Sequence, residues 1–226
     1  MNRFMIVVNP DKDTDSTVTN RIQSYLEAHG AACMVRDVFH LEFSDWEALK
    51  KEQFGCVLVL GGDGTLLRMA GETEDIDIPL FGINLGTVGF LTEGEVANIE
   101  EILDRLLTDD FTIEERMMVT GTVTKADGTT YRKSALNDIV ISRAGFSRLI
   151  GLNVSVDGQV LDTYEADGVV ISTPTGSTGY NLSAGGPIVS PDAELLVITP
   201  VSPHSLTAKS IVLSGKEEIT IEITKK

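Results

Sequence analysis

The sequence is poor in cysteine, in positive charge and in long apolar runs, and each shortage excludes a class of protein. No apolar run in the 226 residues approaches the roughly 20 that are needed to cross a bilayer. Lysine and arginine together number 18 against 34 aspartates and glutamates, so the formal net charge is −16. Long nucleic acids and acidic membrane surfaces are bound by basic patches. We therefore expect neither nucleic acid nor membrane as a partner.

The two cysteines, Cys33 and Cys56, lie in apolar segments, which favours buried, reduced thiols over a disulfide or a metal site. Residues 1–10 contain too short an apolar segment for a signal peptide and predict a first strand ending at Pro10. We expect a cytoplasmic protein. Its acidity does not exclude a small anionic ligand, because backbone N–H groups and a metal ion can hold phosphate locally.

Residues 1–95 alternate between strand and helix signals. Apolar runs at 4–8 and 56–60 are typical of strands, and the second has the continuous pattern of a strand covered on both faces. Segments 32–38 and 79–83 are also expected to be strands. Apolar residues at helical spacing from Val18 to Leu26 predict a helix that stops at Gly30. This alternation indicates a parallel sheet flanked by helices.

The pattern changes near residue 110. Residues 96–107 predict an amphipathic helix with acids on its outer face. Beyond it the strand-like segments are 119–123, 138–142, 152–156, 168–172 and 218–223, with turn signals at 127–128 and 157–158. We place a domain boundary between Thr108 and Phe111, which gives an α/β domain at 1–108 and a mainly β domain at 109–226.

A glycine turn around one carboxylate follows the strand at 56–60. It consists of Gly61, Gly62, Asp63, Gly64 and Thr65. In open α/β sheets the ligand crevice lies outside the carboxyl ends of the strands, and glycine lets a ligand approach the backbone closely. Asp63 would project into this crevice, where a carboxylate can accept a proton from a substrate hydroxyl or help to hold a metal ion. The alternative is a tight turn in which Asp63 caps a helix opened by Thr65.

The turn matches neither a Walker A loop nor Gly-x-Gly-x-x-Gly. Phosphate binding would therefore rest on backbone amides and magnesium. The nearest cation is Arg68, one helical turn onward, which is either a ligand contact or a solvated surface arginine.

A second loop, rich in hydroxyls and glycines, follows the strand at 168–172. It consists of Thr173, Pro174, Thr175, Gly176, Ser177, Thr178, Gly179 and Tyr180. Hydroxyl groups both donate and accept hydrogen bonds, and the glycines permit close approach of a ligand. The alternative is a serine- and threonine-rich helix cap. Asn137 and Asp138 could bind an adenine edge and a ribose diol, or simply begin a strand; Asp167 has the same two interpretations.

These motifs, taken in order, resemble those of NAD kinases. The resemblance rests on 61–65, 84–91, 115–118, 137–138, 173–187 and 203–206, which extend over some two thirds of the chain. The glycine–aspartate motif alone is also similar to diacylglycerol kinases and phosphofructokinases, whereas the full ordered set is specific. The resemblance implies an α/β domain with a parallel sheet, then a mainly β, sandwich-like domain, with the site between them.

The resemblance also implies a reaction and its partners. NAD kinases transfer the terminal phosphate of ATP, or in some members of polyphosphate, to the adenosine-ribose 2′-hydroxyl of NAD and so make NADP. Magnesium is the implied metal ion, although no residue is assigned as its ligand. A homodimer or homotetramer is implied as well.

By the same resemblance Asp63 is the proton acceptor and Gly64 contacts the dinucleotide. Asn137 and Asp138 would bind adenosine or ribose groups, and Asp167 a hydroxyl or amide of NAD. The pocket lining is implied to comprise Thr178, Gly179, Tyr180, Asn181, Leu182 and Ser183. Arg68 and Arg148 stand where the family often places a polar or basic contact.

Three features depart from the family pattern. Gly179 stands where alanine is common, and Asp138 where glutamate is frequent. Family chains usually continue beyond the position of Lys226, so this is expected to be a short variant or a partial chain. Two other functions stay open: a related lipid kinase, disfavoured by the missing basic membrane stripe, and a non-catalytic dinucleotide-binding regulator, disfavoured by the retention of Asp63.

Overall fold

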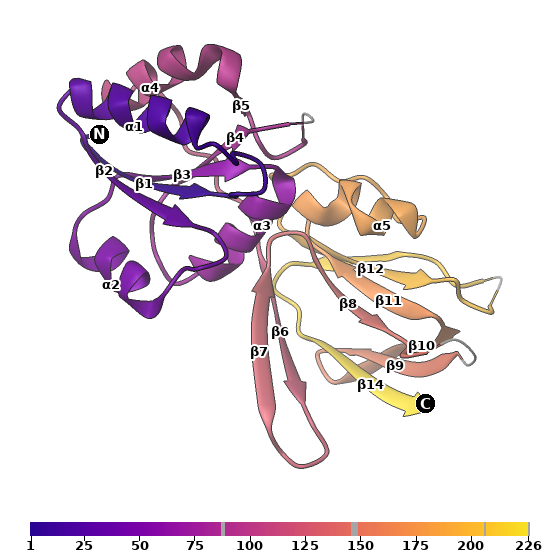
Figure 1. The fold of residues 1–226 in the computed structure, drawn as a ribbon. Coiled ribbons are helices and arrows are strands. Elements are labelled where there is room, and N and C mark those ends of the chain that lie inside the picture. Colours follow the sequence, from indigo (N-terminus) through magenta and orange to yellow (C-terminus); the bar gives the residue numbers. More distant parts are fainter. Residues whose placement is uncertain (87–88, 146–148, 206, 226) are drawn as a thin grey trace. The chain divides into compact units, whose positions relative to one another are not determined.

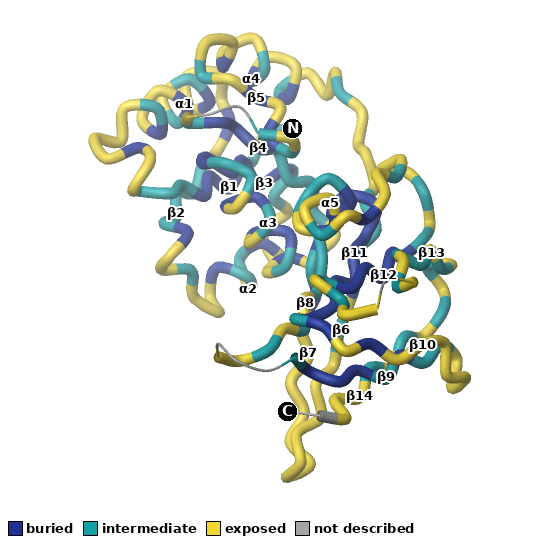
Figure 2. The backbone as a smooth tube through the Cα atoms, turned by 90° about the vertical axis from the view of Figure 1, so that its right-hand side faces the viewer, coloured by how far each residue is buried: buried dark blue, intermediate teal, exposed yellow. Residues whose placement is uncertain are grey.

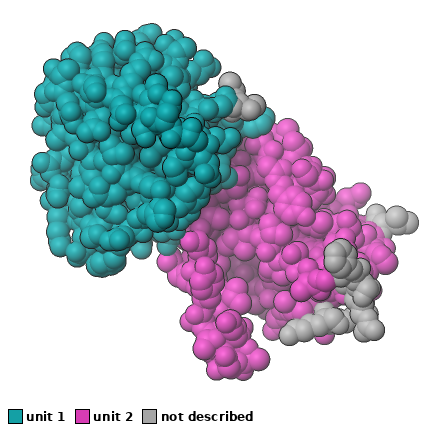
Figure 3. All heavy atoms as spheres, viewed as in Figure 1, with its two compact units in different colours: residues 1–114 teal, residues 115–226 magenta. Residues whose placement is uncertain are grey.

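The computed structural model describes residues 1–86, 89–145, 149–205 and 207–225. The chain divides into two compact units, residues 1–114 and residues 115–226, which Figure 3 shows in different colours. Each unit has a hydrophobic core of its own, so each is described by itself. Within the described residues, no helix is long and apolar enough to span a membrane.

Unit 1 is built on a five-stranded parallel sheet with the strand order β2-β1-β3-β4-β5. The strands are β1 (Arg3–Val8), β2 (Ala32–Asp37), β3 (Cys56–Gly61), β4 (Leu80–Asn84) and β5 (Gly94–Glu95). The helices are α1 (Thr17–Ala28), α2 (Phe43–Lys51), α3 (Asp63–Glu72) and α4 (Ile99–Leu107), with a short 3₁₀ turn η1 (Val96–Asn98) before α4. Helices α1 and α4 pack on one face of the sheet and α2 and α3 on the other (Figure 1).

Both faces of the central strands are buried, as their apolar runs predicted. Successive side chains of a strand point to opposite faces. In β1, Phe4 and Ile6 therefore join the core beneath α1 and α4, while Met5 and Val7 join the core beneath α2 and α3. All four are 0% exposed. Since each buried side chain of this size contributes about 1.5–3 kcal/mol, the sheet needs helices on both faces.

The order of the strands places a topological switch point between β1 and β3. The chain passes from β1 to β2 on one side, returns past β1 to β3, and then continues outward to β4 and β5. Ligand crevices of such sheets form at the carboxyl ends of the strands beside the switch point. There the backbone N–H of Asn9 donates to the carbonyl oxygen of Leu60 at 2.9 Å, so the ends of β1 and β3 are held together.

Unit 2 consists of antiparallel strands in three sheets. A hairpin is formed by β6 (Val119–Thr124) and β7 (Thr130–Ala135). The order β13-β12-β11-β8 joins Ile211–Ser214, Leu195–Val201, Gly168–Ser172 and Asp138–Ser142, and the order β10-β9-β14 joins Gln159–Ala166, Ile150–Val156 and Ile219–Lys225. Two short helices follow β11, namely η2 (Thr175–Thr178) and α5 (Tyr180–Ser183).

The four-stranded and three-stranded sheets share one core. Leu152 and Val154 of β9 join the same buried cluster as Val169 and Ile171 of β11 and Ile198 of β12. Figure 2 shows buried runs along these strands and mostly exposed backbone along the hairpin of β6 and β7. An α/β unit with a parallel sheet followed by a mainly β, sandwich-like unit confirms the predicted fold class.

The structure adds elements that the sequence patterns did not predict. Strands β7 and β10 carry mostly exposed residues and lack a run of buried positions. Helix α2 buries only Asp45 and Leu49 of its nine residues. The strands β12 and β13 were also missed. The predicted turns are confirmed, since Gly128 and Gly158 adopt φ angles of +83° and +77° between paired strands.

The two cysteines differ in their surroundings. Cys56 is buried, as expected, whereas Cys33 is only half-buried. Burial raises the pKa of the Cys33 thiol to about 11 and that of Cys56 to about 12. Both are therefore protonated, unreactive thiols at neutral pH.

Candidate active site

Asp63 is the first residue of α3, directly after the carboxyl end of β3. The helix begins two residues before Thr65, which the sequence analysis had taken as its start. Gly62 is the N-cap residue, with extended φ and ψ angles of −127° and −173°. Gly62 has no side chain that could cap the helix, and the carboxylate of Asp63 accepts hydrogen bonds from a neighbouring loop instead.

The Asp63 carboxylate accepts four hydrogen bonds from the segment 90–92. The N–H of Phe90 donates to Oδ2 at 2.8 Å. Oδ1 accepts from the N–H of Leu91 at 3.1 Å and from both the N–H and the hydroxyl of Thr92 at 3.3 Å. A carboxylate has about four lone-pair positions, two on each oxygen. Among the described residues Oδ2 receives one donor, so this oxygen can still accept a proton or a hydrogen bond.

Gly89 explains how the segment approaches Asp63 so closely. A Cβ atom added at Gly89 would lie 2.0 Å from Oδ1 of Asp63 and 2.4 Å from its Cγ. The position therefore requires glycine for steric reasons. The glycine turn and the motif at 84–91, which were separate in the sequence, thus form one structure around this carboxylate; residues 87 and 88 of the motif lie outside the described residues.

The three glycines of the turn have different environments. A Cβ added at Gly61 would lie 2.3 Å from Oγ1 of Thr65, so Gly61 makes room within the turn itself. At Gly62 and Gly64 an added Cβ would meet nothing within 4 Å. Gly62 and Gly64 therefore present open backbone to a ligand, whereas Gly61 and the buried Thr65 support the turn.

Arg68 is exposed on α3, and its guanidinium carbon lies 5.7 Å from the ring centre of Phe39. Phe39 belongs to the loop that follows β2 and is 48% exposed. Phe39 could not be recognised from the sequence, because a single loop phenylalanine belongs to no motif. That Phe39 lies near Arg68 can be seen only once the strand order β2-β1-β3 is known.

In unit 2 the second loop packs against the Asn137–Asp138 pair. Asp138 is opposite Ser172 in the pairing of β8 with β11, and the N–H of Thr173 donates to the carbonyl oxygen of Asn137 at 2.8 Å. A Cβ added at Gly176 would lie 2.0 Å from that same oxygen. The two motifs predicted separately therefore lie side by side.

Several hydroxyl and amide groups of the loop are used inside the fold. The hydroxyl of Thr173 donates to the carbonyl oxygen of Leu136 at 2.5 Å and accepts from the N–H of Gly176 at 3.1 Å. The Ser177 hydroxyl, 0% exposed, accepts from the N–H of Val189 at 3.1 Å. These hydroxyls stabilise the loop from within, but neither η2 nor α5 has a side-chain cap hydrogen bond of the kind that the alternative interpretation required.

Asn181 has the most extensive internal hydrogen bonds in this region. It is 0% exposed, and its Nδ2 donates to the carbonyl oxygens of Ser177 at 3.0 Å and Pro187 at 2.9 Å. Its Oδ1 accepts from the hydroxyl of Thr199 at 2.7 Å. Thr199 lies on β12 and was not identified from the sequence, because that strand was itself missed.

Other residues of the loop face outward. Tyr180 and Leu182 are each 44% exposed, Ser183 is exposed, and Thr178 and Gly179 are partly exposed. Thr175 is buried, and its Oγ1 accepts a long hydrogen bond of 3.5 Å from Arg116. Arg148, a predicted contact, lies outside the described residues.

Asn137 and Asp138 present a buried acceptor and a half-buried carboxyl group. In the described part of the chain, Oδ1 of Asn137 is buried without a hydrogen-bond partner. Desolvation raises the pKa of Asp138 above its ordinary value. A Cβ added at Gly179 would lie 3.4 Å from Nδ2 of Asn137 and 4.0 Å from Oδ2 of Asp138, so Gly179 adjoins both side chains. Such groups suit a ligand that offers amine and hydroxyl donors.

Asp167 is held by an ion pair. Its Oδ1 lies 2.6 Å from Nε of Arg143, and the two side chains are 34% and 29% exposed. The backbone N–H of Arg143 also donates to the carbonyl oxygen of Asp167 at 2.9 Å. Asp167 is thus fixed in place, and its Oδ2 lies outside this ion pair.

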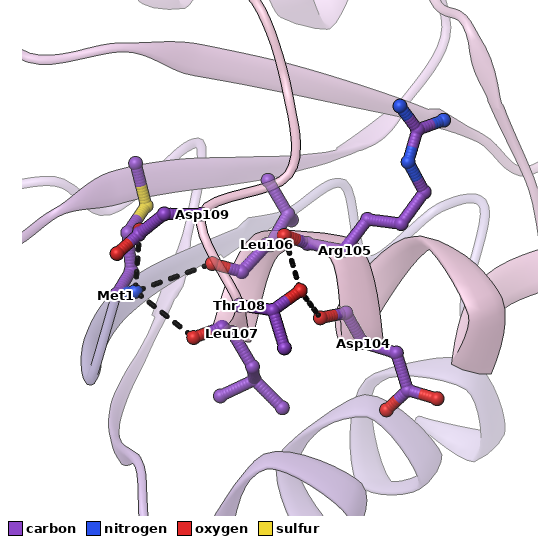
Figure 4. A network of polar contacts seen from close by, with 7 residues as sticks. All are labelled: Met1, Asp104, Arg105, Leu106, Leu107, Thr108 and Asp109. Carbon is purple, nitrogen blue, oxygen red and sulfur yellow. Dashed lines mark hydrogen bonds and ion pairs between the residues drawn. The ribbon is translucent and has the colours of Figure 1, made fainter.

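A separate cavity of about 460 Å³ lies at the opposite edge of the unit 1 sheet. Its lining residues Asn2 and Ala31 precede β1 and β2, so it lies at the amino ends of the strands. Figure 4 shows the adjoining network, in which the Met1 ammonium group donates to the carbonyl oxygens of Leu106 and Leu107 and to Asp109. A cation at the last turn of α4 stabilises the helix terminus. This network is structural and lies away from Asp63.

The chain matches two family models over most of its length. The model of the ATP-NAD kinase N-terminal domain matches residues 4–111, and that of the ATP-NAD kinase C-terminal domain matches residues 136–226. A relative named NAD kinase from Lachnoclostridium phytofermentans is 45% identical over 227 residues, which cover 99% of this chain and 79% of the relative.

Two solved structures resemble the fold closely. The crystal structure of yeast NADH kinase complexed with NADH matches with a TM-score of 0.82 at 25% identity, covering 99% of this chain and 72% of the other. An NAD kinase from Archaeoglobus fulgidus in complex with ATP matches with a TM-score of 0.78 at 30% identity, covering 97% and 80%. The chain belongs to the NAD kinase family, and it is a phosphotransferase with NAD kinase activity that uses ATP as phosphate donor.

Proposed function

We propose that Asp63 accepts the proton of the adenosine-ribose 2′-hydroxyl of NAD while the terminal phosphate of the donor is transferred to that oxygen. The observation that supports this role is the fixed carboxylate at the carboxyl end of β3, whose Oδ2 retains a free acceptor position among the described residues. The 2′-O–H bond breaks, the new P–O bond forms, and the bond to the leaving phosphate breaks. Phosphoryl transfer depends mainly on positioning and charge neutralisation, so one well-placed carboxylate is sufficient as the proton acceptor.

The residues of unit 2 would bind the dinucleotide. Asn137 and Asp138 would contact an adenine amine or a ribose hydroxyl, for which the unpartnered Asn137 Oδ1 is suited. Asp167 would contact a hydroxyl or amide of NAD, and the exposed ring of Tyr180 would pack on a base or ring. Thr175, Thr178, Gly179, Leu182 and Ser183 complete the proposed lining. Ser177 and Asn181 contribute by fixing the loop, since both side chains are 0% exposed.

We propose magnesium as a partner of the donor phosphates rather than of a dedicated protein site. Across the residues that the structure describes, no group of three or more His, Cys, Asp or Glu side chains is placed to hold a metal ion. Magnesium commonly keeps several waters and binds through one or two carboxylates plus substrate phosphates. Bound in this way next to Asp63, it would neutralise charge on the transferring phosphate. We also propose that polyphosphate can replace ATP, that the protein forms a dimer or tetramer, and that it works in the cytoplasm.

The other two functions are not favoured by the relatives found. The family models name ATP-NAD kinase domains rather than a lipid kinase. A regulator that binds NAD without turnover would show no NADP formation, which the assay below detects.

The decisive experiment measures NADP formation by Asp63→Asn beside the parent enzyme and Asp77→Asn. Asp77 is an exposed aspartate of the same unit and serves as a matched control. We expect turnover to fall by roughly 10² or more in Asp63→Asn and to remain at the parent level in Asp77→Asn. NAD affinity, measured separately by calorimetry, should change little.

Near-parent turnover of Asp63→Asn would contradict the proposal. Because the asparagine replaces an acceptor that holds segment 90–92, folding must be checked by thermal denaturation. Asp63→Glu, which keeps the charge, gives a second measure: a large loss of turnover in this variant would show that the position of the carboxylate matters as well as its charge.

A further inference from the structure

Arg143 and Asp167 form a partly buried ion pair where β8 ends and β11 begins. Arg143 directly follows β8, Asp167 directly precedes β11, and the antiparallel pairing of these strands places Ser142 opposite Gly168. Nε of Arg143 lies 2.6 Å from Oδ1 of Asp167, and the backbone N–H of Arg143 donates to the carbonyl oxygen of Asp167 at 2.9 Å. The two residues are therefore joined through both their main chains and their side chains.

Each member of the pair is also held from a second direction. The N–H of Asp167 donates to the carbonyl oxygen of Val201, the last residue of β12, at 3.0 Å. Nη1 of Arg143 donates to the carbonyl oxygen of Gly145 at 2.8 Å. The side chains of Arg143 and Asp167 are 29% and 34% exposed, so a ligand can reach both charges. Such a ligand would meet a carboxylate whose charge is compensated by a fixed neighbour.

The pair lies at the opposite end of β8 from the side chains that are proposed to bind adenosine. Asp138 is the first residue of β8, and Arg143 follows its last residue. At about 3.4 Å per residue, the strand from Asp138 to Arg143 extends over about 17 Å. A dinucleotide has adenosine at one end and nicotinamide at the other, joined through two phosphates. A ligand that begins at Asp138 and extends along this strand brings its nicotinamide end, with the one amide group of NAD, to Asp167.

The nicotinamide ring differs in charge between the two forms of the dinucleotide. The oxidised ring of NAD carries one positive charge, and the reduced ring of NADH carries none. A lone carboxylate at this end would favour the oxidised ring by Coulomb attraction, and a lone guanidinium would disfavour it. We propose that Arg143 compensates the charge of Asp167 at the nicotinamide end, so that this ion pair sets the preference between NAD and NADH. The proposal rests on the proposed contact of Asp167 with NAD.

The ion pair would act on binding of the dinucleotide and not on the chemical step. Reduction changes the nicotinamide ring, whereas the reacting 2′-hydroxyl belongs to the adenosine ribose at the other end. The quantity to measure is therefore the kcat/KM for NAD divided by the kcat/KM for NADH, called the NAD/NADH ratio below. Both substrates are assayed on the same preparation of each variant, so a loss of folded protein cancels in this ratio.

The first test compares two single variants that should shift the NAD/NADH ratio in opposite directions. Arg143→Gln leaves the carboxylate uncompensated, so the ratio should rise by about three- to tenfold. Asp167→Asn leaves the guanidinium uncompensated, so the ratio should fall by a similar factor. Water screens side chains that are about a third exposed, which keeps both shifts modest. Arg143→Lys keeps the charge and should stay within about twofold of the parent ratio.

The second test uses a double variant and a matched control. Arg143→Gln combined with Asp167→Asn removes both charges and should return the NAD/NADH ratio close to the parent value. Lys216 is exposed in the turn after β13, whose Ser214 pairs with Leu195 at the end of β12 remote from Val201. Lys216→Gln removes the same unit of positive charge and should leave the ratio unchanged. Calorimetric affinities for NAD and NADH, measured without ATP, should show the same pattern as the kinetics.

The proposal is overturned if both single variants shift the NAD/NADH ratio in the same direction, or if neither shifts it. An equal rise in the KM for NAD and for NADH in Asp167→Asn also overturns it, because Asp167 would then contact a hydroxyl common to both forms. Unchanged KM values for both forms would remove Asp167 from the binding site, and with it that part of the proposed function. The role of Asp63 fails separately, on undiminished turnover of Asp63→Asn, whatever the ratio in Arg143→Gln.

Discussion

The two candidate regions, one in each unit, are stabilised in opposite ways. In unit 1 the candidate catalytic side chain, Asp63, is held by backbone N–H groups of residues 90–92 and one hydroxyl. In unit 2 the backbone of the second loop is held by side chains, chiefly those of Thr173, Ser177 and Asn181. The first arrangement fixes a reactive group, and the second fixes a surface on which a ligand can lie.

Because of this difference, the polar residues of the two motifs serve different purposes. In the glycine turn the carboxylate of Asp63 is oriented by its neighbours and stays partly accessible. In the second loop most of the polar groups form hydrogen bonds within the fold, and the exposed side chain of Tyr180 is left for a ligand. A count of hydroxyls therefore overestimates the number of ligand contacts. The following substitutions test this comparison.

The largest effect is expected from Gly176→Ala in unit 2. The added Cβ would lie 2.0 Å from the backbone carbonyl oxygen of Asn137, which cannot move without breaking its hydrogen bond to Thr173. We expect a loss of about 3 kcal/mol or more in the free energy of unfolding, measured by denaturant titration. Gly64→Ala is the control, because its Cβ meets open space and its stability should be unchanged or slightly higher.

The next largest effect distinguishes, within one loop, a residue that stabilises the fold from a residue that is proposed to contact the ligand. Asn181→Ala removes three internal hydrogen bonds and leaves buried carbonyl groups without partners. We expect a loss of about 2–3 kcal/mol in stability. Tyr180→Ala should leave the stability nearly unchanged and raise the KM for NAD. Equal stability losses in the two variants would contradict the division proposed here.

A smaller effect is expected at Thr92, whose N–H and hydroxyl both donate to Asp63. Thr92→Val removes the hydroxyl that donates to Oδ1 at 3.3 Å but keeps the backbone N–H. We expect kcat to fall by about three- to tenfold, equivalent to roughly 1 kcal/mol for one hydrogen bond. The KM for NAD should not change, and an altered KM with a normal kcat would argue for substrate binding instead.

The smallest effect is a pH dependence at Asp138. Its pKa is raised by desolvation, while an unfolded aspartate titrates near 3.9. Between those two values the folded state binds more protons than the unfolded state, so stability falls as the pH rises through this window and stays lower above it. Asp138→Asn should therefore be slightly more stable than the parent at pH 7. The difference should vanish below about pH 3.5, as measured by denaturant titration at several pH values.

Local patterns predicted those parts of the fold whose residues are buried on both sides. The runs at 4–8 and 56–60 became β1 and β3, because a fully buried strand must be apolar at each position. Strands β7 and β10 were missed because solvent covers most of their side chains and no apolar period remains. The start of α3 was misplaced because Gly62 caps the helix without a side chain that a pattern could reveal.

The site followed the same rule. Residue types predicted Asp63 and the second loop as candidates, but they did not predict the hydrogen bonds of these residues. The hydrogen bonds from residues 90–92 to Asp63 join positions that are 27–29 residues apart in the chain. The pairing of Phe39 with Arg68 depends on the side-by-side order of β2, β1 and β3.

By itself the sequence determined the two-part architecture and the family, and it predicted Asp63 as the central carboxylate, because burial and ligand chemistry both constrain residue type. Tertiary structure alone decided which polar groups serve the fold and which remain for a ligand. The physical reason is that a hydroxyl, an amide or an arginine has the same identity whether its partner is a neighbouring strand or a substrate. Only the packed chain shows which donors and acceptors are already satisfied.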